Sequence, residues 1–133
     1  MEAHKSTSVY IVDDSDSIRQ RLVSILESID DVAVVGQAGN AADAIAGILA
    51  THPDSVLLDL NLGGGSGLEM LKTLHQQLPI VKFVILTNHS EPQYRRACAR
   101  AGAEYFLDKS TEFDTVRNII AGIAAGHPIG RAL

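Results

Sequence analysis

The sequence predicts an α/β fold in which five parallel strands form a single doubly wound sheet. Short, continuously apolar runs alternate with segments in which apolar residues recur at the helical period. Runs without polar alternation are typical of strands that are covered on both faces. No linker, repeat or low-complexity segment interrupts the order. The 133 residues are therefore expected to form one domain, residues 1–133, with a core over about residues 8–125.

The expected strands are short apolar runs at residues 9–12, 32–35, 56–60, 83–86 and 105–107. Each run is followed by apolar residues at helical spacing, within residues 18–29, 41–49, 68–78, 94–101 and 113–123. One helix is therefore expected after each strand. Strict alternation of this kind implies right-handed crossovers and helices on both faces of the sheet.

Residues with strong local preferences mark several helix ends. Asn40 and Thr111 are expected N-caps, because their side chains can accept a hydrogen bond from a free backbone N–H. Pro53 and Pro79 are expected to follow helix ends, and Gly102 suits the left-handed position after the fourth helix.

Composition excludes several classes of protein. The net charge is −5 and no run of Lys or Arg is present, which argues against a surface that neutralises nucleic-acid phosphates. The single cysteine, Cys98, excludes an internal disulfide and reads as a small core residue. No apolar run approaches the roughly 18 residues of a membrane span, and no secretory h-region is visible. A cytoplasmic location is expected.

Polar residues gather where the expected strands end. In parallel sheets, ligands bind outside the carboxyl ends of the strands, and the flavodoxin-like strand order 2-1-3-4-5 makes four of these ends neighbours. The second strand ends in “GQAG” and brings no comparable group. The other four ends bring the candidate site residues Asp13, Asp14, Asp59, Asn61, Thr87 and Lys109.

Three carboxylates in one pocket repel one another and lose solvation, so they need a cation. Oxygen ligands suit a hard divalent ion such as Mg²⁺, which keeps several waters and bridges to phosphate oxygens. Lys109 adds a second positive charge. A carboxylate in such surroundings can act as a nucleophile toward a phosphoryl group and form an acyl phosphate. Asp59 is the best placed, because it ends a central strand.

Each residue also has a simpler interpretation. The role of Asp13 and Asp14 could be simply to cap the first helix, and Asp16 is expected to cap it. Thr87 could be an ordinary residue at a strand end. His89, two residues after Thr87, is a candidate for a contact with the phosphoryl group that affects the attacking water.

Four motifs occur in the order and spacing of one family: “VDD” after the first strand, “LLDLNL”, “ILT” and “FLDKS”. From about Val9 to about Ala125 the chain resembles the receiver domain of bacterial two-component response regulators, a fold like that of the chemotaxis receiver. The segment “DLNLGGGSGLEML” is most similar to receivers that precede a helix-turn-helix output domain. Whether the chain stands alone or is a fragment of a larger regulator is left open.

The resemblance implies a role for each motif residue. Asp59 would be the phosphoacceptor, and Asp14 and Asp59 would ligate Mg²⁺ with the backbone carbonyl of Asn61. Asp13 would act closer to the outer coordination sphere. Thr87 would hydrogen-bond the phosphoryl group, Lys109 would pair with another of its oxygens, and Phe106 would be the aromatic switch residue.

The resemblance also implies a signalling function. A histidine kinase or histidine phosphotransfer protein would donate the phosphoryl group. The domain would catalyse the transfer and its own slow dephosphorylation, which leaves its status as an enzyme open. The face made by helix 4, strand 5 and helix 5 would then switch and contact an unknown output protein, an output domain or a second receiver. Direct binding to nucleic acid or membrane is not expected. The expected residues of this face are Tyr94, Arg95, Arg96, Arg100, Tyr105 and Asp108.

The chain departs from the family pattern at three positions. Ser110 stands where many receivers have proline, so the isomer of the Lys109–Ser110 peptide is left open. Gly63 stands where proline is common, in a glycine segment expected to be a turn. Phe106 lacks the hydroxyl of the frequent tyrosine, so packing alone would hold an inward ring.

Three other functions compete with that of a phosphorylated receiver. One is a degenerate or phosphate-sink receiver that acts by protein binding. A phosphatase of the haloacid-dehalogenase type also uses an aspartyl nucleophile, but it needs a second Asp where Asn61 stands. A flavodoxin-like electron carrier is disfavoured, because “DDSDS” would repel the flavin phosphate and tryptophan is absent.

Overall fold

The computed structural model describes residues 6–62 and 65–126. Its main sheet has five parallel strands in the order β2-β1-β3-β6-β7. Counting only these strands, this is the predicted order 2-1-3-4-5, so the predicted fold class is confirmed. The strands are β1 (Thr7–Val12), β2 (Val32–Ala38), β3 (Ser55–Leu58), β6 (Lys82–Thr87) and β7 (Tyr105–Asp108).

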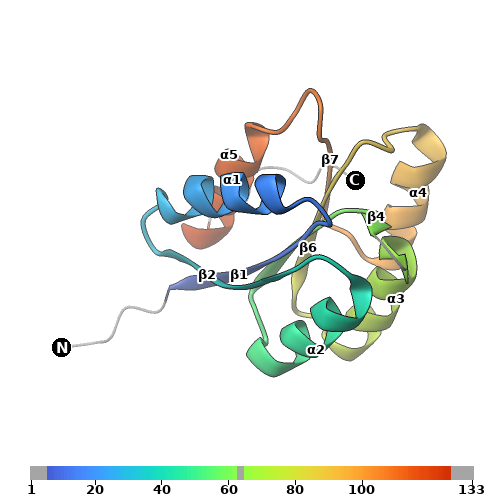
Figure 1. The fold of residues 1–133 in the computed structure, drawn as a ribbon, viewed down its shortest axis with the longest axis horizontal. Helices are drawn as coiled ribbons and strands as arrows, with labels where there is room; N and C mark the ends of the chain where they lie inside the picture. The colour runs from blue at the N-terminus through green and yellow to red at the C-terminus, as the bar shows by residue number, and fades with distance from the viewer. Residues whose placement is uncertain (1–5, 63–64, 127–133) are drawn as a thin grey trace.

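Helices cover both faces of this sheet (Figure 1). Buried side chains of α1 and α5 share one core cluster, and those of α2, α3 and α4 share the other. Each predicted helix is present and follows its strand. The helices are α1 (Asp16–Glu27), α2 (Ala41–Thr51), α3 (Gly67–Gln77), α4 (Pro92–Ala101) and α5 (Thr115–Ala124).

Strand β1 shows why the apolar runs lack alternation. Val9 and Ile11 pack in the cluster under α1 and α5, whereas Tyr10 and Val12 pack in the cluster under α2, α3 and α4. Successive side chains point to opposite faces of a strand. Because both faces are buried over residues 9–12, all four of these positions are apolar or aromatic.

The glycine segment after β3 forms a small hairpin that was not predicted. β4 (Asn61–Leu62) pairs antiparallel with β5 (Gly65–Ser66), while residues 63 and 64, including the Gly63 position, lie outside the described residues. β3 itself ends at Leu58, two residues earlier than expected. A Cβ on Gly67 would lie 2.5 Å from the carbonyl oxygen of Asp59, so this approach of α3 requires glycine.

Most expected helix ends are correct, and one is wrong. The Asn40 side chain accepts a hydrogen bond from the Asp43 N–H at 2.9 Å, and Gly102 adopts a φ of 110°. Thr111 is not an N-cap, because α5 begins only at Thr115. Instead, the Thr111 N–H donates to the Asp108 carbonyl, so this segment is a turn after β7.

Among the residues that the structure describes, no helix is long and apolar enough to cross a membrane. No peptide bond is cis in the same residues, so the Lys109–Ser110 peptide is trans.

Candidate functional site

The carboxyl ends of β1, β3, β6 and β7 are neighbours in the sheet and carry the predicted site. The backbone hydrogen bonds between neighbouring strands continue just beyond the strand ends, where the site residues lie. The Asp59 N–H donates to the Val12 carbonyl at 3.0 Å, and the Lys109 N–H donates to the Thr87 carbonyl at 2.8 Å. These bonds place the backbones of Asp59 and Lys109 beside the ends of the adjacent strands.

Three carboxylates converge at this edge. Asp13, Asp14 and Asp59 each offer an oxygen, and these oxygens lie within 4.8 Å of one another. Asp13 and Asp59 are only 2% and 5% exposed, whereas Asp14 is exposed. The predicted acidic cluster is thus present, with two buried members and one facing solvent. Three carboxylate oxygens at this spacing could hold a metal ion.

The ammonium of Lys109 bridges the two buried carboxylates. Its Nζ lies 2.7 Å from Asp13 Oδ2 and 2.8 Å from Asp59 Oδ2, and the side chain is 11% exposed. Burial works against the charged ammonium, but the hydrogen bonds and negative charges of Asp13 and Asp59 outweigh it and raise the pKa of Lys109. Lys109 therefore supplies fixed positive charge beside Asp59.

We expect Lys109→Met to lower the free energy of unfolding by about 3 kcal/mol in metal-free buffer, because it leaves two buried carboxylates without their cation. Urea denaturation measures this change. Lys72→Met is the matched control, since the Lys72 ammonium is exposed and pairs with Glu69 at 3.2 Å. The control should cost at most about 0.5 kcal/mol. Equal stability of the two variants would contradict the assigned role of Lys109.

The remaining carboxylate oxygens are also oriented by the backbone. Asp13 Oδ1 accepts the Ser15 N–H at 2.9 Å, and Asp59 Oδ1 accepts the Asn61 N–H at 3.2 Å. These contacts hold each side chain in one orientation. Asn61 therefore lies beside the acidic cluster, as expected from the sequence.

Arg19 was not predicted as part of this region. Its guanidinium donates to the Asp13 carbonyl at 2.6 Å and to Gln37 Oε1 at 3.1 Å, and it also pairs with Asp16. It thereby secures the turn after β1. Ser15 is the N-cap of α1, so the prediction that Asp16 caps this helix is wrong; Asp16 lies in the first turn, where its negative charge is favourable. The three-residue spacing of Asp16 and Arg19 was the available signal.

Thr87 ends β6 and is fully buried. Its Oγ1 accepts the N–H of His89 at 3.2 Å. His89 is exposed, and its ring contacts that of Tyr94 with centroids 5.5 Å apart. The hydroxyl of Thr87 is thus held by the loop that leads into α4.

Phe106 lies on β7 opposite Ile85 of β6 and is 1% exposed. Tyr105 was expected on the surface of helix 4, strand 5 and helix 5, and this is wrong. Tyr105 is buried in the cluster under α1 and α5. Adjacent strand residues point to opposite faces, and both faces of β7 are covered, so neither ring is a surface group.

Ser110 takes part in the turn after β7. Its N–H and hydroxyl both donate to Asp108 Oδ1, at 2.8 and 2.6 Å. The side-chain hydrogen bond from Ser110, followed by that from Ser90, lowers the pKa of Asp108 to about 2. The residue that replaces the common proline therefore anchors the turn that presents Lys109.

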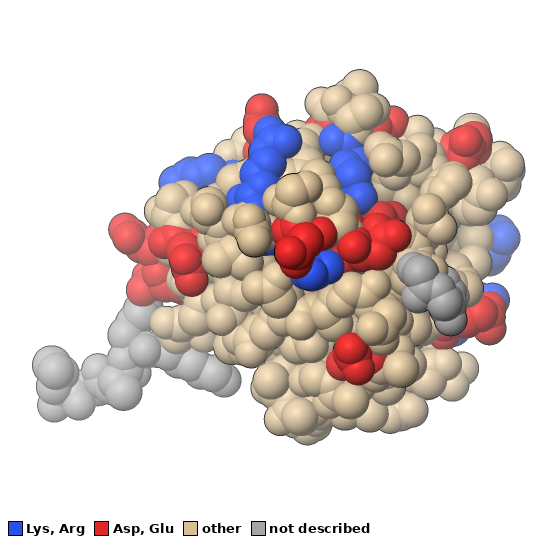
Figure 2. All heavy atoms as spheres, in the orientation of Figure 1, with Lys and Arg blue, Asp and Glu red and all other residues tan. Residues whose placement is uncertain are grey.

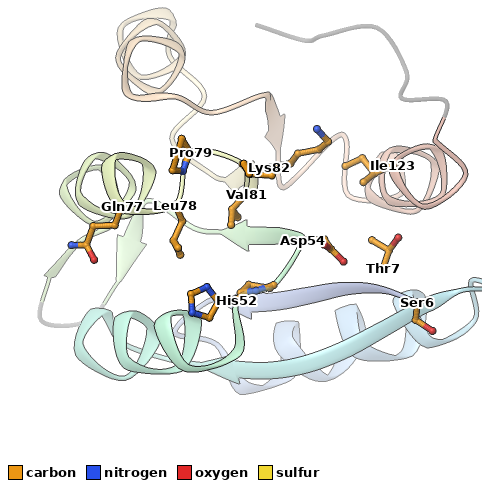
Figure 3. A pocket seen from close by; sticks show the side chains of 12 residues that line it. Ser6, Thr7, His52, Asp54, Gln77, Leu78, Pro79, Val81, Lys82 and Ile123 are labelled. Carbon is orange, nitrogen blue, oxygen red and sulfur yellow. The ribbon is translucent and has the colours of Figure 1, made fainter. Parts of the chain in front are cut away.

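A cavity of about 560 Å³ lies elsewhere, at the amino ends of β1, β3 and β6 (Figure 3). Its lining includes Thr7, Asp54 and Lys82. The Asp54 carboxylate accepts the Ser8 N–H at 2.8 Å and so ties two strand starts together. These residues do not form a cluster comparable to the acidic one, so we assign the chemistry to the carboxyl ends of the strands.

Comparisons with known proteins identify the family of the chain. Residues 9–121 match the family described as the response regulator receiver domain. The chain is 30% identical to the DNA-binding transcriptional activator DevR/DosR of Mycobacterium tuberculosis over 91% of its own length and 56% of that protein. It is 34% identical to the nitrate/nitrite response regulator protein homolog of Haemophilus influenzae, over 91% of this chain and 58% of the relative.

Solved structures show the same fold. A two-component response regulator of the LuxR family from Aurantimonas sp. SI85-9A1 superposes with a TM-score of 0.84 and 27% identity, covering 93% of this chain and 89% of that one. The chain spans little more than half the length of the two curated relatives named above. With four strand-end motifs in one site and a family match over residues 9–121, the chain belongs to the receiver domains of two-component response regulators.

Proposed function

We propose that this receiver domain accepts a phosphoryl group on Asp59. One observation carries the proposal: Asp59 lies in the three-carboxylate cluster and also contacts Lys109, at 2.8 Å. Asp13 shares both features but follows the strand next to the edge strand β2, whereas Asp59 follows the central strand. Asp59 is also the aspartate that matches the phosphoacceptor motif of the family.

We propose Mg²⁺ as the metal ion. Asp14, Asp59 and the backbone carbonyl of Asn61 would hold it, with Asp13 toward the outer sphere. This donor set fits the ion, because hard divalent cations favour carboxylate and carbonyl oxygens. When bound, Mg²⁺ would neutralise charge that develops on the phosphoryl oxygens.

The side chains have distinct roles in the proposed transfer. A carboxylate oxygen of Asp59 attacks phosphorus, and the bond between phosphorus and the donor breaks, which leaves an acyl phosphate on Asp59. Lys109 then pairs with a phosphoryl oxygen, as it now pairs with the carboxylate. The Thr87 hydroxyl donates its hydrogen to another phosphoryl oxygen, while its oxygen can keep accepting the His89 N–H.

The proposed donor is a histidine kinase or a histidine phosphotransfer protein in the cytoplasm. The surface of α4, β7 and α5 is the proposed output face, which contacts an output protein, an output domain or a second receiver. Basic side chains on the face drawn in Figure 2 are interspersed with acidic and uncharged ones. The net charge of −5 supports a protein partner over a nucleic acid.

Intact-mass measurement tests the proposal. The wild-type chain, incubated with acetyl phosphate and Mg²⁺, should gain the mass of one phosphoryl group, and a chelator should prevent the gain. A degenerate receiver would gain nothing, which would contradict the proposal. Rapid, repeated turnover of acetyl phosphate without a phosphorylated species would instead indicate a phosphatase.

A further inference from the structure

The Phe106 ring is already buried while the Thr87 hydroxyl is bonded to the His89 N–H. Phe106 faces Ile85 across the β6–β7 pair, and Thr87 lies two residues beyond Ile85. Thr87 and Phe106 therefore point to the same face of the sheet. The ring is thus buried while Thr87 keeps its contact with His89, so any coupling between the two residues depends on the elements that contact them both.

Arg95 of α4 contacts Phe106 in two ways. Its guanidinium carbon lies 4.7 Å from the centroid of the ring, a distance suited to a cation–π contact. Its Nη1 also donates to the Phe106 carbonyl at 3.4 Å. A planar guanidinium can make both contacts at once, which a lysine ammonium does less well. Arg95 thus holds the ring and the backbone of the same residue.

The first turn of α4 is linked to Thr87 through the loop residue His89. The His89 N–H donates to Thr87 Oγ1, and the His89 ring contacts Tyr94, which directly precedes Arg95. The N–H groups of Tyr94 and Arg95 both donate to the Glu91 carbonyl, so the two residues belong to one rigid turn. A continuous set of contacts therefore runs from Thr87 through this turn to Phe106.

We propose that Arg95 is a positioning residue that clamps Phe106 in its buried packing, and that the first turn of α4 couples this clamp to Thr87. The inference rests on the proposed phosphorylation of Asp59. When the Thr87 side chain moves toward the phosphoryl oxygens, the His89 N–H that bonds to its oxygen follows, the loop at residues 88–91 moves with it, and Arg95 shifts over the ring. Phosphorylation then changes the balance between two placements of α4.

The test uses Arg95→Leu, which keeps an apolar cover over Phe106 but removes the guanidinium. NMR of the Phe106 ring and of the α4 amides is recorded with and without acetyl phosphate and Mg²⁺. We expect the ratio of the two placements of α4 to shift roughly fivefold away from the one in which Arg95 holds Phe106, because one cation–π contact is lost. Intact mass gives the extent of phosphorylation of Asp59 in each sample, so the spectra of Arg95→Leu and of the wild type are compared at the same extent of phosphorylation.

Two variants serve as comparisons. Arg96→Leu makes the same change in charge at the next, exposed position and should leave the Phe106 signals as in wild type. Arg95→Lys should restore only part of the wild-type pattern. If Arg95→Leu showed wild-type Phe106 signals, and if its α4 amide signals changed on phosphorylation as in the wild type, the proposed role of Arg95 would be wrong.

Failure of the clamp and failure of the proposed function give different results. If no chain gains phosphate, the proposed function fails. The Phe106 signals of the unphosphorylated Arg95→Leu and wild-type chains still decide whether Arg95 holds the ring.

Discussion

Asp59→Asn is expected to fold like the wild type and to gain no phosphoryl group from acetyl phosphate and Mg²⁺. The amide is not a nucleophile toward phosphorus, so the reaction has no acceptor. The fold should survive, because the change removes one negative charge from a crowded cluster. Lys109 keeps its partner Asp13 at 2.7 Å.

Intact mass and urea denaturation measure the two parts of this prediction. Asp16→Asn is the matched control, since Asp16 is an exposed aspartate close in sequence to the cluster but outside it. It should gain phosphate as the wild type does. Phosphate on Asp59→Asn at the wild-type level would show that the acceptor has been wrongly assigned.

Asp14→Ala should weaken Mg²⁺ binding by about tenfold or more, because a direct ligand is lost from a site that has few. The fold should be unaffected, since Asp14 is exposed and its removal leaves no buried group unpaired. Titration calorimetry with Mg²⁺ gives the affinity, and phosphorylation should slow in parallel.

The comparison for Asp14→Ala is Asp16→Ala, which removes a nearby carboxylate that does not belong to the acidic cluster. Its Mg²⁺ affinity should equal that of the wild type. If Asp14→Ala also bound Mg²⁺ with wild-type affinity, the metal site would have to lie elsewhere.

The sheet could be predicted from the sequence because burial on both faces leaves a simple signal. β1 is apolar or aromatic over residues 9–12 and β6 over residues 83–86, and the helices between the strands keep a clear helical period. The small hairpin of β4 and β5 gave no such signal. Its strands have two residues each, and they depend on glycines and on the approach of α3 to Asp59 rather than on apolar pattern.

One error came from a local turn, and another came from a tertiary contact. Thr111 has the right chemistry for an N-cap, but the Asp108 carboxylate and carbonyl organise that segment into a turn. Tyr105 lies on the edge strand β7, where exposure was expected, yet it is buried with the side chains of α1 and α5.

The site residues could be predicted because parallel strands bring their carboxyl ends to one edge. Asp13, Asp59, Thr87 and Lys109 each follow or end a strand, so the strand order alone makes them neighbours. The ion pairs of Lys109 and the contact of Arg95 with Phe106 join residues from different elements. They depend on side-chain conformation, which periodicity does not determine.

Borohydride trapping tests the central claim most directly. Borohydride reduces an aspartyl phosphate to homoserine, which marks the acceptor residue permanently, and peptide mass spectrometry then locates it. For wild-type chain treated with acetyl phosphate and Mg²⁺, we predict homoserine at residue 59 and unchanged aspartate at residues 13 and 14. Homoserine at residue 13 or 14, or phosphate gain without any homoserine, would contradict phosphorylation of Asp59.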